Sequence, residues 1–301
     1  MSKRIFASLL VVCMLLLTTV PAIAHGRSSV SVGQLHGNSD EEDLQEDITN
    51  LIISLSDDTF YENTYNWFPE DTTVENIHSA AEGVGESESI VFYIGHGNKL
   101  SGYTPPKYYI RAGDGSDHKV YADNNQIVSD GIYPNTPSYP NPKFVFLWSC
   151  WQGNETGYYD FGAERAVGMP YAILRDPDLS EDGYNNPDSS GHAFIGFEEM
   201  AYWLQGEIWD VDDAGYEFLS LFYEYALDPD EPFTVNEALD EASDFLWGVS
   251  FDDNPFRFSF YGSIVVYGNG DILISPKPSG GGGGGFEPPP LLPTGGRDSD
   301  E

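Results

Sequence analysis

Two residues of this chain have side chains that together could attack and cleave an acyl bond. Cys150 carries a thiol, and His96 carries an imidazole that can accept and return a proton near neutral pH. A cysteine with an ordinary pKa is only a few per cent thiolate at neutral pH, so a cysteine nucleophile needs a base or a cation beside it. The pair therefore indicates nucleophilic catalysis by Cys150, with His96 as the base. The ordinary alternative is that Cys150 is a buried, inert side chain.

Each of these residues follows a short apolar run that is typical of a buried strand. Ile90–Ile94 (IVFYI) leads to His96, and Phe144–Trp148 (FVFLW) leads to Cys150. Runs rich in β-branched and aromatic residues, without polar alternation, indicate strands buried on both faces. If the two strands are neighbours in a parallel sheet, both side chains emerge at the same carboxyl edge, where open α/β sheets bind their ligands.

Glycines stand beside both candidate catalytic residues. Gly95 and Gly97 flank the histidine, and Gly153 follows the cysteine by three positions. Because glycine has no side chain, its backbone N–H can come close to a substrate carbonyl. Backbone donors of this kind could form an oxyanion hole.

The two motifs, IVFYIGHG followed by FVFLWSC, resemble those of the caspase-like (clan CD) cysteine peptidases, which include caspases, legumains, clostripain, gingipains and separase. The resemblance covers about Val74–Leu174. It implies an α/β fold, a three-layer α/β/α sandwich with a mostly parallel central sheet, C-terminal helices and a closing hairpin. It also implies that Cys150 is the nucleophile, that His96 is the general acid and base, and that the N–H groups of Gly97 and Cys150 bind the oxyanion. No cofactor is required by this reading.

The chain also departs from the caspase pattern. Caspases place a glycine two residues after the cysteine, within QACRG, whereas here Ser149 replaces the alanine and Gly153 comes three residues after Cys150. The chain is closer in character to secreted prokaryotic members such as the gingipain- and clostripain-like peptidases, so the substrate preference of caspases is not expected. No third catalytic residue is identified by motif.

Acidic residues in two loops are candidates for a substrate pocket. A carboxylate in the pocket that receives the residue before the scissile bond would favour Arg or Lys there, as the resemblance to clostripain and gingipains implies. The spacing of Asp176, Asp178 and Asp182 also resembles that of calcium-binding loops. The glycine and the final Glu of an EF-hand are missing, so calcium is only a possible ligand, and an ordinary solvated loop is the alternative. The candidates are Asp114, Asp176, Asp178 and Asp182.

Other hydrolytic chemistries find little support in the sequence. His118 and His192 lie in predicted loops and are expected to be exposed polar residues. The histidines show no zinc-ligand spacing. A serine hydrolase is disfavoured because the sequence contains no Gly-x-Ser-x-Gly elbow.

The charge of the chain excludes one class of partner. It has 49 acidic and 13 basic residues and a formal net charge of −36. Such a field repels phosphates, and no stripe of Lys or Arg opposes it, so nucleic acid is not expected as a partner. The acidity could reflect a salt-rich habitat, cation binding, attraction of basic substrates, or solubility alone. The expected partner is a protein or peptide substrate, and the expected oligomeric state is a monomer.

The first 24 residues are typical of a secretory signal peptide. Lys3 and Arg4 precede an apolar core, Ile5–Val20, and a small-x-small triplet ends at Ala24. We therefore expect a secreted, extracellular protein. Cys13 would leave with this peptide, so Cys150 would have no partner for an intrachain disulfide. No later segment approaches the roughly 18 to 20 apolar residues that a membrane span needs.

Composition divides the remaining chain into three parts. Residues 25–42 are polar and acidic and predict a disordered leader. Residues 43–276 are expected to form one caspase-like catalytic domain, and residues 277–301 a flexible acidic tail rich in Gly and Pro.

Apolar periodicity places the helices of the catalytic domain. One helix is expected from Leu44 to Leu55, and another after an N-cap at Thr72. The run Tyr171–Leu174 is expected to be buried. Three amphipathic helices should follow the extended run Ala193–Phe197. The first is marked by Met200, Trp203, Leu204 and Ile208, the second by Tyr216, Leu219, Phe222 and Tyr223, and the third by Val235, Leu239, Ala242 and Leu246, after a capping box of Thr234 and Glu237. Arg257–Tyr267 and Asp271–Ile274 predict the closing hairpin.

A second function remains open at this point. A degenerate caspase-like fold could serve as a non-catalytic extracellular binding module for a glycan or surface polymer, using some of the 19 tyrosines and 6 tryptophans. Labelling with iodoacetamide separates the two, because a buried, unreactive Cys150 would favour the binding module.

Overall fold

The computed structural model describes most of the region expected to form the catalytic domain, together with a segment that precedes it. The described residues are 26–32, 39–58, 61–67, 71–81, 89–100, 106–113, 119–122, 131–132, 142–154, 168–174, 181–258 and 263–275. The predicted signal peptide and the predicted tail lie outside them.

The fold is built on a six-stranded sheet with the order β10-β9-β8-β3-β1-β2. All neighbouring pairs are parallel except β10 with β9, so the sheet is mostly parallel, as predicted. The strands are β1 (Gly26–Val32), β2 (Tyr61–Trp67), β3 (Ser89–Ile94), β8 (Phe144–Trp148), β9 (Ala193–Phe197) and β10 (Ile264–Gly268).

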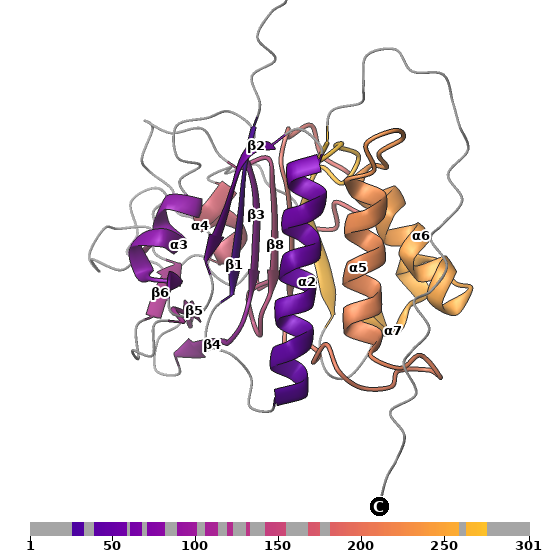
Figure 1. Ribbon diagram of the computed structural model, residues 1–301, viewed down its shortest axis with the longest axis horizontal. Helices are drawn as coiled ribbons and strands as arrows, with labels where there is room; N and C mark the ends of the chain where they lie inside the picture. Colours follow the sequence, from indigo (N-terminus) through magenta and orange to yellow (C-terminus); the bar gives the residue numbers. More distant parts are fainter. Residues whose placement is uncertain are drawn as a thin grey trace, which may run out of the picture.

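Helices cover both faces of this sheet and make a three-layer α/β/α sandwich, which was also predicted (Figure 1). On one face lie α2 (Ser39–Asp58) and α5 (Ala214–Ala226), with α6 (Val235–Trp247), the short 3₁₀ helix η3 (Phe251–Asp253) and α7 (Pro255–Phe258). On the other lie α3 (Val74–Ala81) and α4 (Met169–Leu174), so the buried run that contains Tyr171 is helical.

A smaller sheet with the order β4-β5-β6-β7 stands beside α3. Within it β5 pairs with both β4 and β6 in the antiparallel sense. The pattern did not predict that a strand begins at Gly97, directly after the histidine. The four strands are β4 (Gly97–Leu100), β5 (Lys107–Arg111), β6 (Lys119–Ala122) and β7 (Gly131–Ile132).

Successive residues of the two central strands enter two separate cores, because strand side chains alternate between faces. Phe92 and Phe146 pack in the core beneath α2 and α5, whereas Tyr93 and Leu147 pack in the core beneath α3 and α4. Every residue of β8 is buried. The prediction that these strands are buried on both faces is therefore confirmed.

The expectation of a disordered leader over residues 25–42 is wrong for its described residues, 26–32 and 39–42. Residues 26–32 form β1, which lies inside the main sheet between β2 and β3, and α2 begins at Ser39 instead of near Leu44. The sequence of β1 is rich in serine, so a search for apolar runs does not identify it as a strand. Its backbone can nevertheless pair on both sides, with β2 and with β3.

One helix begins one residue later than predicted, and two others are confirmed. The N-cap of α3 is Thr73 instead of Thr72, since the Thr73 Oγ1 accepts the N–H of Asn76 at 3.2 Å. The capping box of Thr234 and Glu237 at the start of α6 is confirmed, and α5 and α6 are the second and third predicted helices.

The first of the three helices predicted after β9 does not form. Residues 198–213 adopt turns and irregular backbone. Their amides bond to other partners, since those of Leu204 and Gln205 donate to the carboxylate of Glu41, and that of Ile208 donates to Val211. With its amides committed in this way, the segment lacks the hydrogen bonds of a helix.

The closing hairpin is also corrected. β10 pairs with β9, but residues 271–274 do not fold back along it. Leu273 instead forms a bridge with Thr234, and the N–H of Val235 donates to the carbonyl of Ile272 at 3.0 Å. Residues 271–274, which were expected to form the second strand of the hairpin, therefore pack against the start of α6.

Candidate functional site

The loops that carry His96 and Cys150 leave adjacent parallel strands at the same level. β3 and β8 are paired in register from Ile90 with Phe144 to Ile94 with Trp148. Each candidate residue follows the last strand residue by two positions. A further bond, from the N–H of Gly95 to the carbonyl of Trp148 at 3.3 Å, carries the pairing one step beyond the strands. The predicted juxtaposition of the two strand ends is therefore observed.

Gly97 joins the two loops by close packing. A Cβ added at this position would lie 2.3 Å from the Ser149 Oγ, 2.5 Å from the carbonyl oxygen of Cys150 and 2.6 Å from the Gln152 Nε2. Only glycine allows the backbone after the histidine to approach the backbone of the cysteine loop so closely.

The thiol of Cys150 is partly buried and has a backbone donor. Its Sγ accepts the N–H of Ala201 at 3.3 Å. Burial raises the pKa of the thiol, and the hydrogen bonds from the N–H groups of Ala201 and of Cys150 itself lower it by less. At neutral pH the resting side chain is therefore the uncharged thiol.

His96 is held by β5 through its backbone. Its carbonyl accepts the N–H of Arg111 at 3.0 Å and lies 3.2 Å from the hydroxyl of Tyr93. Burial lowers the pKa of the imidazole, and the nearby charge of Arg111 lowers it further. The imidazole is therefore neutral at pH 7 and can accept a proton.

The residues directly after Cys150 fix the shape of its loop. Trp151 has a left-handed backbone with φ of 69°, and its N–H donates to the carbonyl of Glu199 at 2.5 Å. The buried Gln152 donates through its Nε2 to the carbonyls of Tyr109, at 3.0 Å, and of Cys150, at 2.6 Å. Sequence reasoning missed Trp151, Gln152 and Ala201, and the only local signal was the position of the first two beside the cysteine.

Gly153 has a packing role in place of the predicted approach to substrate. Its N–H donates to the carbonyl of Phe197 at 2.7 Å, and an added Cβ would lie 2.5 Å from a methyl carbon of Val265. This glycine therefore fits the loop against β9 and β10.

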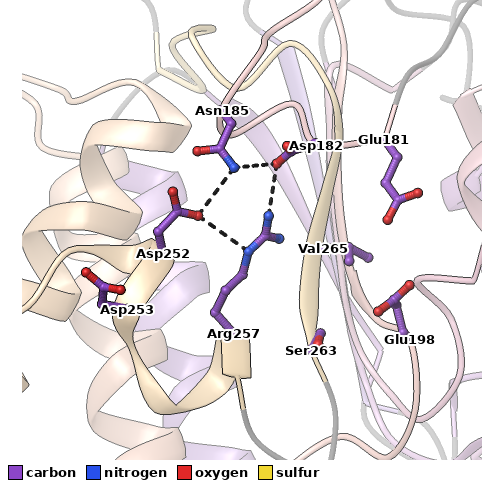
Figure 2. Close-up of a pocket in the computed structure, with 9 residues that line it drawn as sticks. All are labelled: Glu181, Asp182, Asn185, Glu198, Asp252, Asp253, Arg257, Ser263 and Val265. Carbon is purple, nitrogen blue, oxygen red and sulfur yellow. Dashed lines mark hydrogen bonds and ion pairs between the residues drawn. The ribbon is translucent and has the colours of Figure 1, made fainter.

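Of the four predicted pocket carboxylates, only Asp182 belongs to the described residues, and the structure does not bring it into the site. Its Oδ1 accepts from the Arg257 Nη2 at 2.9 Å and from the Asn185 Nδ2 at 2.7 Å (Figure 2). Neither Cys150 nor His96 lines this pocket of about 760 Å³. Its lining residues are Glu181, Asp182, Asn185, Glu198, Asp252, Asp253, Arg257, Ser263 and Val265. Asp114, Asp176 and Asp178 lie outside the described residues.

The described part of the chain contains no group of three or more His, Cys, Asp or Glu side chains that could hold a metal ion. Calcium at the loop of Asp176 stays a prediction, since most of its candidate ligands are outside that part. His192 is half-buried, and its Nδ1 lies 2.8 Å from the carbonyl of Pro142, so it supports the chain before β8. His118 is not among the described residues. No described helix is long and apolar enough to cross a membrane.

Comparison with known proteins shows that this chain is similar in fold to several solved structures. Neither protein-family models nor curated proteins match the sequence. The crystal structure of the Arg-specific cysteine proteinase gingipain R (RGPB) aligns with 84% of this chain and 48% of its own, at 15% identity and a TM-score of 0.44. A complex of the Porphyromonas gingivalis RgpB pro- and mature domains aligns with 85% of this chain and 50% of its own, at 15% identity and a TM-score of 0.45.

The crystal structure of the Drosophila initiator caspase Dronc aligns with 84% of this chain and 82% of its own, at 11% identity and a TM-score of 0.42. The chain spans about half the length of the gingipain chains that it matches. At these identities the likeness concerns the fold, and the chemistry of this chain is argued from its own site.

Proposed function

We propose that the protein is a secreted cysteine endopeptidase in which Cys150 attacks the peptide carbonyl and His96 transfers the protons. The observation that carries the proposal is the pairing of β3 with β8. It sets a thiol and an imidazole, each two residues beyond its strand, at one edge of the sheet. Secretion rests on the predicted signal peptide at residues 1–24, and the expected substrate is a protein or peptide.

The pKa shifts favour proton transfer during the reaction over a preformed ion pair. Burial raises the pKa of the Cys150 thiol and lowers that of the His96 imidazole, so both groups rest in their neutral forms. In this state His96 is ready to act as a general base, and the thiol gives up its proton as it attacks.

The reaction then follows in two halves. His96 takes the proton of Cys150, and the thiolate adds to the peptide carbonyl carbon. The C–N bond breaks as His96 returns the proton to the leaving amine, and a thioester remains on Cys150. His96 next deprotonates a water molecule, whose oxygen attacks the thioester. The C–S bond breaks, the carboxylic product leaves, and Cys150 regains its proton.

The oxyanion that forms in each half needs hydrogen-bond donors. We assign this role to the backbone N–H groups of Gly97 and Cys150, because the absence of a side chain at Gly97 brings its backbone against the cysteine loop. Donors already fixed in the folded backbone stabilise the developing charge without further reorganisation.

Hydrolysis of a mixed fluorogenic peptide library tests the proposal. The purified protein should cleave members of the library in the presence of a reductant, which keeps the thiol from oxidising. Cys150→Ala should remove this activity. Equal residual hydrolysis by the wild type and the variant would contradict the assignment. If iodoacetamide also failed to modify native Cys150, the result would favour the non-catalytic binding module.

A further inference from the structure

The segment of residues 199–205, which follows β9, forms one wall of the Cys150 loop. It contains no helix or strand, so its position depends on individual hydrogen bonds. Three bonds join it to the end of β8 and the residues after it. They run from the Trp151 N–H to the Glu199 carbonyl (2.5 Å), from the Ala201 N–H to the Cys150 Sγ (3.3 Å), and from the Trp148 Nε1 to the Tyr202 carbonyl (2.7 Å).

The other end of the 199–205 segment is held by a carboxylate from a distant part of the chain. Glu41, in the first turn of α2, accepts the N–H of Leu204 on Oε1 at 2.9 Å and that of Gln205 on Oε2 at 2.8 Å. Gln45, one turn later in the helix, lies with its Nε2 at 3.3 Å from the same Oε1.

Because Glu41 is buried, its carboxylate depends on these hydrogen bonds. The residue is 2% exposed, and a buried carboxylate is costly unless donors surround it. Two consecutive backbone N–H groups and a side-chain amide supply those donors. Because each oxygen takes one of the two backbone donors, the carboxylate fixes the orientation of both peptide planes.

We propose that Glu41 is a positioning residue for Cys150, which fixes the 199–205 segment and thereby holds the Ala201 N–H against the nucleophilic sulfur. This inference rests on the proposed function for its catalytic meaning. The effect of Glu41 on the geometry around the Cys150 thiol does not depend on whether the protein is a peptidase. The hydrogen bond from Ala201 favours the thiolate over the thiol, so a change in its geometry alters how readily Cys150 ionises.

Replacing Glu41 with Gln tests the role and separates it from a simple charge effect. The amide keeps one acceptor oxygen but turns an NH₂ donor toward the second backbone N–H, so the segment must shift. A shift that weakens the Ala201 bond makes the thiolate harder to form. Removal of a negative charge without any shift would make it easier. The two explanations therefore predict opposite changes.

The measurement is the pH dependence of iodoacetamide modification of native Cys150, followed at that residue by mass spectrometry. In Glu41→Gln we expect the midpoint to move to higher pH and the rate at neutral pH to fall by about threefold to tenfold, since only the thiolate reacts. Glu46→Gln is the matched control, because Glu46 is exposed on the same helix. A wild-type profile in folded Glu41→Gln, a shift to lower pH, or an equal shift in both variants would overturn the proposal.

A second variant covers the case in which Glu41→Gln does not fold, as judged by its thermal melt. Glu41→Asp keeps the charge but withdraws both oxygens by one methylene, so it should shift the profile in the same direction by a smaller amount. A wild-type profile for Glu41→Asp would then overturn the role of Glu41. Because alkylation needs no substrate, this outcome is distinguishable from a failure of the peptidase proposal.

Discussion

The edge that carries Cys150 and the pocket around Arg257 both gather polar side chains against the main sheet, but only the pocket contains described ion pairs. At the first, burial shifts the pKa of the Cys150 thiol toward its neutral form and that of the His96 imidazole likewise, and the thiol accepts a hydrogen bond from the backbone N–H of Ala201. In the second, Arg257 pairs with Asp182 at 2.9 Å and with Asp252 at 3.6 Å (Figure 2).

This difference agrees with the proposal that Cys150 and His96 carry the chemistry. Neutral titratable groups held by backbone contacts can exchange a proton without breaking an ion pair. Opposite charges that are paired with each other hold local structure and change protonation only at a cost. Variants in the first region should therefore change activity, and variants in the second should change stability. Three experiments at the edge that carries Cys150 and one in the pocket separate these two effects.

Loss of the imidazole should have the largest effect. His96→Ala removes the general base and should lower kcat/KM by roughly 10²- to 10⁴-fold, with little change in the melting temperature. His192→Ala is the matched control, because the His192 Nδ1 lies 2.8 Å from the carbonyl of Pro142, ahead of β8, and His192 has no role in the proposed reaction. Similar losses of hydrolysis in both variants would contradict the role of His96 as the general base.

A methyl group at Gly97 should damage both the loop packing and the reaction. In Gly97→Ala the added carbon would overlap atoms of Ser149, Cys150 and Gln152, so we expect a loss of about 1 to 3 kcal/mol in the free energy of unfolding, together with weaker hydrolysis. Gly191→Ala is the control, since no atom lies within 4 Å of its added carbon. Denaturant unfolding and kcat/KM measure the two effects, and a Gly97→Ala protein with wild-type values for both would disprove the close approach.

The pH profile should distinguish a neutral pair from an ion pair. Only neutral His96 can act as the base, so hydrolysis should fall about tenfold per pH unit below the pKa of His96. Because burial lowers this pKa, the midpoint of the acid limb should lie below about 6.5. The alkylation rate of Cys150 should rise through a midpoint above that of an unburied thiol, since burial raises the pKa of Cys150. A thiolate that persists down to pH 4 would show an ion pair instead.

The smallest effect is expected in the pocket. Burial raises the pKa of Glu198, and the charge of Glu181 raises it further, so the ionised carboxylate is less favourable in the folded than in the unfolded state. Glu198→Gln should therefore stabilise the protein at pH 7, by less than about 1 kcal/mol because the side chain is partly exposed. The gain should disappear at a pH below the unfolded-state pKa, where the wild-type carboxyl is protonated in both states.

Urea unfolding at pH 7 and pH 3 measures this gain, and hydrolysis should remain at the wild-type level. A destabilised Glu198→Gln would mean that the ionised carboxylate has a favourable partner in the pocket. A large loss of hydrolysis would mean that the pocket takes part in the reaction.

The positions of His96 and Cys150 could be predicted because each residue follows a short apolar run in the sequence. Two short apolar runs end in a histidine and a cysteine, and neighbouring parallel strands bring such ends together. The register that aligns Ile94 with Trp148 is not visible in either run alone. It follows from the packing of both strands into the two cores on either side of the sheet.

The support of the site could not be predicted because it depends on contacts between distant residues. Glu41 acts on backbone amides at residues 204 and 205, and a polar residue in an acidic stretch gives no signal of such a bond. The same bonds explain why the helix expected from the apolar spacing of Met200, Trp203 and Leu204 is absent. Tertiary partners for the amides outweighed the local preference for a helix.

The interior position of β1 makes the main sheet sensitive to proteolytic trimming. In the described sheet β2 pairs only with β1, and β1 separates it from β3. Cleavage after Val32 would free β1 from the chain and leave the edge strand β2 without a partner. It would also expose the backbone of β3, the strand that leads to His96, so an overtrimmed chain would lose order at this edge of the sheet.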